Sequence, residues 1–305
     1  MSIDSVLLIA FGGPTAPDEI RPFLEIVSRG RRIPPERLDE VAHHYEQMPG
    51  GRSPLNALTL AQARALADTL AAQGIRVPVF AGMRNWHPFL HETLADMAAQ
   101  GAERALGIIL SALRTEASWE RYQADVAAAR ARTPGAPEVV FAPPWGTHPR
   151  FIDTVVDRVS AAFKEVPLAR RTTTPLVFTA HSVPVPMAEA SPYVADFTAA
   201  AEAVVTRLGH PRWTLAYQSR SGNPRDPWLE PDVNDVLAQL AAEGATDVVI
   251  MPIGFVCDHV ELLYDLDVEA ARTAKAAGIT LHRAAAVNDY PDFIAMLADL
   301  VKGAR

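Results

Sequence analysis

Short apolar runs alternate along the chain with longer segments in which apolar positions recur at helical spacing. Short, continuously apolar runs bounded by turn residues are typical of strands that are buried on both faces of a parallel sheet. Such runs predict strands at residues 6–11, 77–83, 105–110, 139–142, 176–180, 214–218, 248–254 and 280–283. The segments between them predict helices at residues 55–73, 89–100, 119–132, 151–163, 193–208, 233–243, 260–277 and 290–301.

The alternating order predicts an α/β fold of two Rossmann-like, flavodoxin-type halves, each a four-stranded parallel sheet flanked by helices. A Pro-rich segment at residues 142–149 separates the first four strands from the last four. We therefore expect halves at residues 1–145 and 146–305, with the last helix packing on either one. A flavodoxin-like half has strand order 2-1-3-4 and binds ligands at the switch point between strands 1 and 3. A ligand cleft between the halves is expected.

The assumed strand order brings two chemically active side chains together in the second half. His181 directly follows one predicted strand, and Glu261 lies six residues beyond Phe255, where the third strand of this half ends. An imidazole next to a carboxylate suits a divalent first-row metal ion or the abstraction of a proton. A simpler interpretation of His181 is a strand-end histidine that hydrogen-bonds to the backbone.

The segment around Glu261 is rich in carboxylates. Glu261, Asp265 and Glu269 are four residues apart, so on a helix they form one stripe with neighbours roughly 6 Å apart. Like charges at this spacing repel, which indicates that something positive binds there. Two alternatives remain open: Asp258 and Glu261 also fit a capping box with Asp258 as the N-cap, and the other acids fit a solvated helix face.

Composition excludes several classes of function. The chain has 36 acidic and 28 basic side chains and no basic run with interleaved aromatics, which argues against a nucleic-acid partner. No apolar run is long enough to span a membrane, and a strand starts too early for a targeting segment, so we expect a cytoplasmic protein. The single cysteine, Cys257, excludes a disulfide framework and a four-thiolate iron–sulfur cluster.

Familiar nucleotide and nucleophile motifs are missing. Gly12, Gly13 and Pro14 after the first strand fit a ligand-approach loop or a tight turn, but neither GxGxxG nor GxxxxGK[ST] occurs. The segment QSRSG at 218–222 lacks the GxSxG pattern of a nucleophilic serine. No HExxH or paired CxxC accompanies the histidines, which argues against a closed zinc site.

Taken together, the segments resemble the ferrochelatases, which insert ferrous iron into a porphyrin. The matching stretches are LLIAFGGP (7–14), RPFLEIVSRGRRIP (21–34), HYEQMPGGRSPLN (44–56), TAHSVP (179–184), YQSRSG (217–222), WLEPD (228–232) and GFVCDHVELLYDLDVEA (254–270). They occur in the family's order and cover nearly the whole length. The resemblance implies two Rossmann-like halves with the porphyrin in the cleft, and Fe²⁺ as a substrate in haem biosynthesis.

The resemblance also implies residue roles. His181 and Glu261 would be the catalytic pair on the metal side, with His181 binding iron or accepting a pyrrole proton and Glu261 assisting deprotonation. Asp265 and Glu269 match outer acidic positions that could relay the metal.

On the porphyrin side, the resemblance implies that Phe11, Arg29, Ser53 and Tyr122 contact the substrate. Arg29 would hold a propionate, and Phe11 stands where some members have a tyrosine that touches the metal, so that contact is lost. Core packing with Trp119 is the alternative for Tyr122. Some members carry a [2Fe–2S] cluster, which one cysteine does not permit here.

The identity of the tetrapyrrole is less constrained. The FGGP and SRGRRIP details look closer to members that use coproporphyrin III, with four propionates, than to those that use protoporphyrin IX, with two. Two other functions remain open: a chelatase for another metal and tetrapyrrole, which should show more histidines at the cleft strands, and a non-catalytic haem or tetrapyrrole carrier. The acidic stripe favours the enzyme, since a carrier needs no path for a cation.

Overall fold

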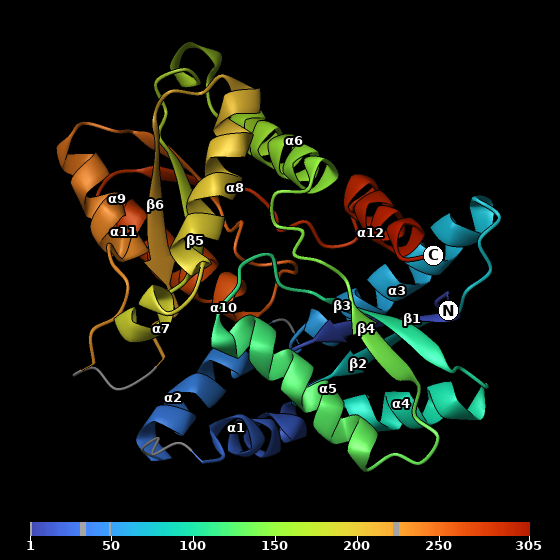
Figure 1. Ribbon diagram of the computed structural model, residues 1–305. Helices are drawn as coiled ribbons and strands as arrows, with labels where there is room; N and C mark the ends of the chain where they lie inside the picture. The colour runs from blue at the N-terminus through green and yellow to red at the C-terminus, as the bar shows by residue number, and fades with distance from the viewer. Residues whose placement is uncertain (1, 31–34, 49, 222–225) are drawn as a thin grey trace. The chain divides into compact units, whose positions relative to one another are not determined.

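The computed structural model describes residues 2–30, 35–48, 50–221 and 226–305, and its strands form two separate four-stranded sheets (Figure 1). Positions 31–34, 49 and 222, which belong to three of the motif stretches, lie outside the described residues. Both sheets are entirely parallel, with strand orders β2-β1-β3-β4 and β6-β5-β7-β8. The predicted order is confirmed in both. The strands are β1 (Ser5–Ala10), β2 (Val79–Met83), β3 (Arg104–Ile109), β4 (Glu138–Phe141), β5 (Leu176–His181), β6 (Trp213–Gln218), β7 (Asp247–Met251) and β8 (Thr280–Arg283).

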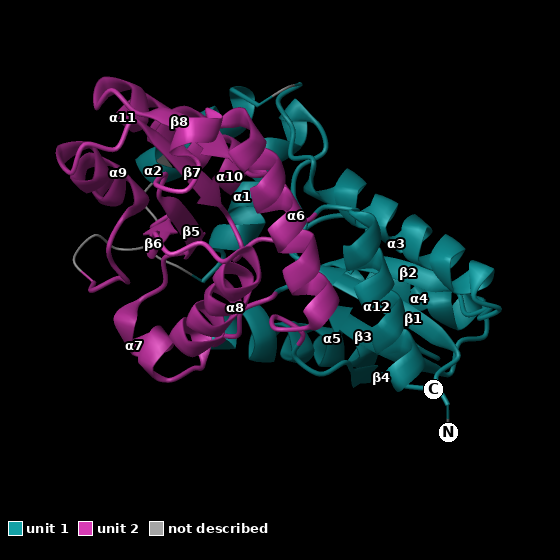
Figure 2. Ribbon diagram, turned by 90° about the horizontal axis from the view of Figure 1, so that it is seen from above, with its two compact units in different colours: residues 1–111, 116–144, 288–305 teal, residues 112–115, 145–287 magenta. Residues whose placement is uncertain are grey.

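The chain divides into two compact units (Figure 2). Unit 1 comprises residues 1–111, 116–144 and 288–305, and unit 2 comprises residues 112–115 and 145–287. The last helix, α12 (Pro291–Gly303), packs on α3 (Leu55–Ala72) and therefore belongs to unit 1. The sequence had left the place of this helix open.

Helices cover the first sheet through apolar contacts. Leu94 of α4 (Leu90–Ala99) and Val126 of α5 (Arg121–Ala131) pack with Leu7 and Ile9 of β1 in one buried cluster. Helix α3 packs on β1 and β2. Unit 1 also contains α1 (Ile20–Ser28) and α2 (Pro35–Glu46), which contact each other and were not predicted from the sequence. None of the helices in the described residues is both long and apolar enough to cross a membrane.

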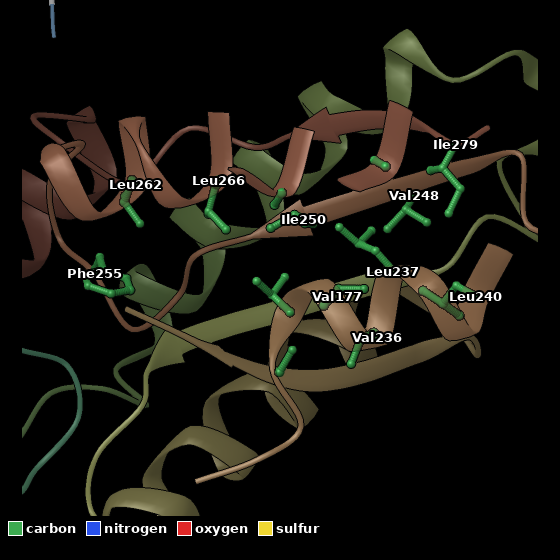
Figure 3. Close-up of a cluster of buried hydrophobic side chains, with 14 of the residues drawn as sticks. Val177, Val236, Leu237, Leu240, Val248, Ile250, Phe255, Leu262, Leu266 and Ile279 are labelled. Atoms are coloured by element: carbon green, nitrogen blue, oxygen red, sulfur yellow. The ribbon is translucent and has the colours of Figure 1, made fainter. Parts of the chain in front are cut away.

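In unit 2, the acidic segment after β7 is held to the second sheet by its own apolar positions. Leu262 and Leu266 are fully buried with Val177 and Ile250 of the sheet (Figure 3). Helix α9 (Val233–Ala242) contributes Leu237 to the same cluster. The remaining helices of this unit are α6 (Pro149–Glu165), α7 (Val185–Glu189), α8 (Tyr193–Leu208), α10 (Val260–Leu263) and α11 (Ala271–Ala276).

The helix predicted over residues 260–277 is not continuous. A π-helical segment, Asp265–Ala270, separates α10 from α11, and the carbonyl of Tyr264 accepts hydrogen bonds from both the Val268 and Glu269 amides. A second π segment, Glu116–Glu120, follows β3 in unit 1, at the position equivalent to the segment after β7. Since π turns are rare and often occur at functional sites, the two loops that follow the third strand of each unit are candidate functional sites.

A buried carboxylate at the start of β7 supports unit 2 at the opposite end of the strand. Asp247 accepts hydrogen bonds from His282 (3.0 Å) and Thr246 (2.8 Å) and pairs with Arg170 (2.9 Å). Burial alone would raise the pKa of Asp247, but these donors outweigh it and lower the pKa below its usual range. The ionised form is therefore the one that stabilises the fold.

We expect Asp247→Asn to destabilise the protein near neutral pH and to matter less in acid. A carboxyl with a lowered folded-state pKa contributes stability above its unfolded value of about 3.9, and this contribution disappears as the pH falls through the folded value. Urea unfolding should show a deficit of roughly 1–3 kcal/mol at about pH 6 and a smaller one at about pH 3. The exposed Asp68→Asn serves as the control. An equal deficit at both pH values would contradict the assignment.

Candidate functional site

His181 and Glu261 meet at the carboxyl edge of the second sheet. His181 is the last residue of β5, and Glu261 lies in the first turn of α10. The His181 Nε2 and Glu261 Oε1 atoms are 3.7 Å apart, so the predicted convergence of the two side chains is confirmed. Gly254 permits the approach, because a Cβ there would come within 2.8 Å of the Cα of Ala180.

The backbone fixes the tautomer of His181. Its Nδ1 lies at hydrogen-bonding distance from the carbonyl of Ser182, and a carbonyl only accepts, so Nδ1 carries the proton. Nε2 then has a free lone pair that faces the Glu261 carboxylate. Two acceptors 3.7 Å apart share no hydrogen bond, but bonds of roughly 2.0–2.2 Å to nitrogen and oxygen let one cation bridge them.

The strand end that carries His181 is rigidly supported. Tyr193 of α8 donates a hydrogen bond from its hydroxyl to the His181 carbonyl (2.8 Å). Burial, with further contributions from Tyr217 and Glu261, raises the pKa of Tyr193. The phenol therefore stays protonated and remains a donor.

The predicted capping box is wrong. The N-cap of α10 is His259, whose Nδ1 accepts a hydrogen bond from the Glu261 amide (3.3 Å), and not Asp258. Asp258 is instead paired with Arg283 at the end of β8 (2.7 Å). Asp258 binds Arg283 and does not cap the helix. The Glu261 side chain faces His181 and not a capping partner.

His259 is a site residue that the sequence analysis did not assign. Burial lowers the pKa of His259, although the nearby Glu261 and Asp258 carboxylates act in the opposite direction. The ring is therefore neutral, and because Nδ1 accepts from the Glu261 amide, Nε2 carries the proton. The only signal in the sequence was its place between Asp258 and Glu261 in the DHVE stretch.

Arg283 divides the acidic segment into two sets. It donates to Asp258 and twice to Asp267, at 2.5 and 3.0 Å. Asp265 accepts a hydrogen bond from the Ser219 hydroxyl, and Glu269 is exposed on the π segment. Glu261, Asp265 and Glu269 are not among the carboxylates that Arg283 is shown to bind, and of the three Glu261 is the one that lies next to His181.

Unit 1 carries a groove of about 460 Å³ that is rich in cations. Phe11, at the end of β1, is 39% exposed and lines it together with the exposed Arg29, as two of the predicted substrate residues. The arginines among the described lining residues are Arg29, Arg84, Arg121 and Arg132, against the single carboxylate of Asp125. Such a groove suits an anionic ligand with apolar parts.

Arg84 was not assigned a role by the sequence analysis. Its side chain is 9% exposed, donates from Nε to Asp125 (2.6 Å), and stacks over the Tyr122 ring with its Cζ 4.3 Å from the centroid. The Arg84 side chain lines the groove. Its Nη1 makes no hydrogen bond to the described residues. It can donate to a bound carboxylate.

Ser53 and Tyr122 are not among the described residues that line this groove. Ser53 is buried against Gly13, where a Cβ would come within 2.9 Å of its hydroxyl, and its amide donates to Pro14 (2.9 Å). Tyr122 lies in the core cluster with Leu7 and Ile9. Both residues support the loops around the groove from behind.

Comparison with known proteins gives a consistent assignment. The family model described as Ferrochelatase matches residues 4–305. The coproporphyrin III ferrochelatases of Frankia alni and Mycobacterium avium are 45% and 44% identical over the whole chain, covering 80% and 89% of those proteins. The ferrochelatase of Rhodopirellula baltica is 41% identical over 98% of the chain and 85% of that protein.

Solved structures agree at the level of the fold. SirB from Bacillus subtilis with Fe³⁺ superposes with a TM-score of 0.60 at 14% identity, covering 98% of this chain and 94% of that one. CbiX, described as the terminal enzyme of sirohaem biosynthesis in denitrifying bacteria, gives a TM-score of 0.55 at 16% identity over 99% of both chains. The two-sheet Rossmann-like architecture is therefore that of chelatases.

We expect Arg283→Met to destabilise unit 2 by roughly 2–3 kcal/mol, because it leaves Asp258 and Asp267 without their shared charge-assisted donor. In Arg37→Met, the exposed pair with Glu40 is lost, and the cost should stay below about 1 kcal/mol. Urea unfolding of both variants measures the difference. Equal effects would show that the Arg283 cluster is only a surface pair.

Proposed function

Because the chain belongs to the ferrochelatase family, we propose that it inserts ferrous iron into coproporphyrin III in haem biosynthesis, as a lyase that acts through His181 and Glu261. The observation that carries the assignment of residues is the 3.7 Å approach of His181 Nε2 to Glu261 Oε1. Iron is a substrate here, and the single cysteine leaves no set of ligands for a cysteine-bound cluster.

Insertion removes two pyrrole protons and replaces them with one Fe²⁺, so the ring keeps its charge. Because Nδ1 of His181 faces the Ser182 carbonyl, its Nε2 is the nitrogen that can take a pyrrole proton or ligate the arriving metal. Glu261 supplies a carboxylate at the same point, which can accept the second pyrrole proton and stabilises an imidazolium or the arriving cation. Imidazole next to carboxylate prefers first-row metals to magnesium.

Asp265 and Glu269 provide the approach for the cation. Carboxylate oxygens exchange for water in the shell of a divalent ion, so acids spaced along one face let the ion shed water in steps. Asp265 begins the π segment and Glu269 is exposed on it, while Glu261 is the acid next to His181. The proposed path therefore ends at the base that takes the proton.

The choice of coproporphyrin III is supported by charge in unit 1. Its four propionates need more cationic donors than the two of protoporphyrin IX, and the groove offers Arg29 and the uncommitted Nη1 of Arg84. The full-length relatives that are 44–45% identical are named as coproporphyrin III ferrochelatases. Phe11 has no hydroxyl to offer as an axial ligand, so its role in the groove is apolar contact.

We expect His181→Ala and Glu261→Gln to lower the rate of iron insertion at least about a hundredfold, since each removes a group that handles protons or metal. Disappearance of the free-base porphyrin spectrum under anaerobic conditions measures this rate. The exposed His43→Ala, which loses only a surface contact with Glu46, should retain the wild-type rate. Wild-type turnover in either site variant would refute the assignment.

The purified protein should convert coproporphyrin III with a larger kcat/KM than protoporphyrin IX. Iron insertion into the two free bases, measured in the same detergent and buffer, decides the point. Faster insertion into protoporphyrin IX would overturn the substrate assignment but not the chelatase activity. Tight porphyrin binding without any spectral conversion would instead indicate a carrier.

A further inference from the structure

Two consecutive residues at the end of β6 hold the acidic segment from the side. Gln218 donates from Nε2 to the backbone carbonyl of Glu261 (2.7 Å), and Ser219 donates from its hydroxyl to the Asp265 carboxylate. Gln218 is also the register partner of His181 in the parallel pair of β5 and β6, and its carbonyl accepts from the Ser182 amide (2.7 Å). One dipeptide therefore contacts both the strand end that carries His181 and the helix that carries Glu261.

Each of these two residues has a feature that is unfavourable for the stability of the fold. Gln218 is 1% exposed, and its buried Oε1 has no hydrogen-bond partner among the described residues. A flipped amide is no remedy, because Oε1 would then face the Glu261 carbonyl, two acceptors against each other. Ser219 has φ of 63°, in the left-handed region that is unfavourable for a residue with a Cβ.

Stability alone would favour other side chains at both positions. A methionine has nearly the volume of glutamine and removes the orphan Oε1, although it also takes the donor from the Glu261 carbonyl, and a glycine accepts the left-handed backbone without strain. Backbone strain and unsatisfied polar atoms concentrate at functional sites, where the surrounding structure maintains them. The two costs fall on adjacent residues whose side chains both reach the acidic segment, which links them to that segment.

The two hydrogen bonds also bracket a change of helix type. Glu261 lies in α10 and Asp265 begins the π segment, so the switch from the narrower to the wider turn takes place between the two anchored positions. The anchor on Glu261 is to its backbone, which fixes where the side chain starts. The anchor on Asp265 is to its carboxylate, which fixes where the charge lies.

We propose that Gln218 and Ser219 are positioning residues of the metal site, which hold Glu261 opposite His181 and Asp265 next in line. The proposal rests on the proposed function of His181 and Glu261 as the metal-side pair. Neither residue needs to contact the iron. Gln218 sets the gap between Nε2 and Oε1, and Ser219 sets the orientation of the following carboxylate, so that a cation finds both ligands already in place.

Gln218→Met tests the first anchor, with Thr179→Val as the matched control. Thr179 lies on neighbouring β5, is fully buried, and its Oγ1 also lacks a hydrogen-bond partner among the described residues. Both substitutions remove a buried orphan oxygen, but only the first removes a bond to the acidic segment. We expect Thr179→Val to have a Tm no lower than that of the wild type, and Gln218→Met to have a Tm close to it, because the lost hydrogen bond and the removed orphan oxygen oppose each other.

The readout is metal binding and not stability. Titration with Co²⁺ alone, followed by visible absorption, should show about a tenfold weaker Kd in Gln218→Met and no change in Thr179→Val. In turnover, Gln218→Met should raise the KM for Fe²⁺ and leave the KM for the porphyrin unchanged. An unchanged Co²⁺ Kd, or a lower Tm with both KM values raised alike, would overturn the proposal.

Ser219→Gly and Ser219→Ala test the second anchor. Both remove the hydroxyl, but only glycine relieves the left-handed backbone, so the glycine variant should have the higher Tm while both bind Co²⁺ more weakly than the wild type. Retention of wild-type Co²⁺ affinity in both would refute a positioning role for Ser219.

The same experiments separate the two proposals. Suppose that the wild type converts no porphyrin but that Gln218→Met binds Co²⁺ more weakly than the wild type does. The proposed function then fails, and the positioning of a cation site stands. If the wild type inserts iron and the variants bind and use metal normally, the proposed function stands and the positioning role fails.

Discussion

Burial of Leu262, Leu266 and Ala270 against the second sheet is the interaction on which the proposed metal site depends. These residues recur at the same spacing as Glu261, Asp265 and Glu269, one position further along the chain, and all three are fully buried. Each buried leucine contributes roughly 1.5–3 kcal/mol, whereas like charges four residues apart oppose the helix by only a few tenths of a kcal/mol. Packing therefore outweighs the repulsion and holds the segment that carries these acids against the second sheet.

Ion pairing then distinguishes some of these carboxylates from the others. Arg283, on the neighbouring β8, takes Asp258 and Asp267 and holds them in a part-buried cluster. Asp258 therefore pairs with Arg283 and does not cap α10, and His259 is the N-cap residue. A single arginine thus binds two of the carboxylates of this segment, and the proposed metal ligands are not among them. In the groove of unit 1 the signs are reversed: one carboxylate, Asp125, binds Arg84, whose Nη1 makes no hydrogen bond to the described residues.

Much of the fold and part of the site could be predicted from the sequence, because they follow from local periodicity and the rules of parallel sheets. The strand order and the meeting of His181 with Glu261 needed only the apolar runs and the switch-point rule. The cap of α10 was mispredicted because it depends on Arg283, which lies 25 residues beyond Asp258 in the sequence. The π segment was missed because its residues have an ordinary helical pattern.

Arg84 and His259 escaped sequence analysis for a related reason. An arginine in a polar loop looks exposed, and only the placement of Asp125 and Tyr122 on α5 shows that it is buried. A histidine between two acids looks like a surface residue, and only the helix start shows that its ring is enclosed and neutral. For Arg84 the burial is set by partners far away in the sequence, and for His259 the neutral ring follows from its burial at the helix start.

The first residue of β7 stabilises the fold, and the chain beyond its last residue carries the proposed metal ligand Glu261. At its first residue, Asp247 is tied to His282 and Arg170, and beyond its last residue the chain leads into the acidic segment. Five strand residues place these ends on the order of 15 Å apart. Directed evolution for acid tolerance and redesign of metal selectivity can therefore proceed on opposite rims of one sheet, with little risk that a gain at one rim is lost at the other.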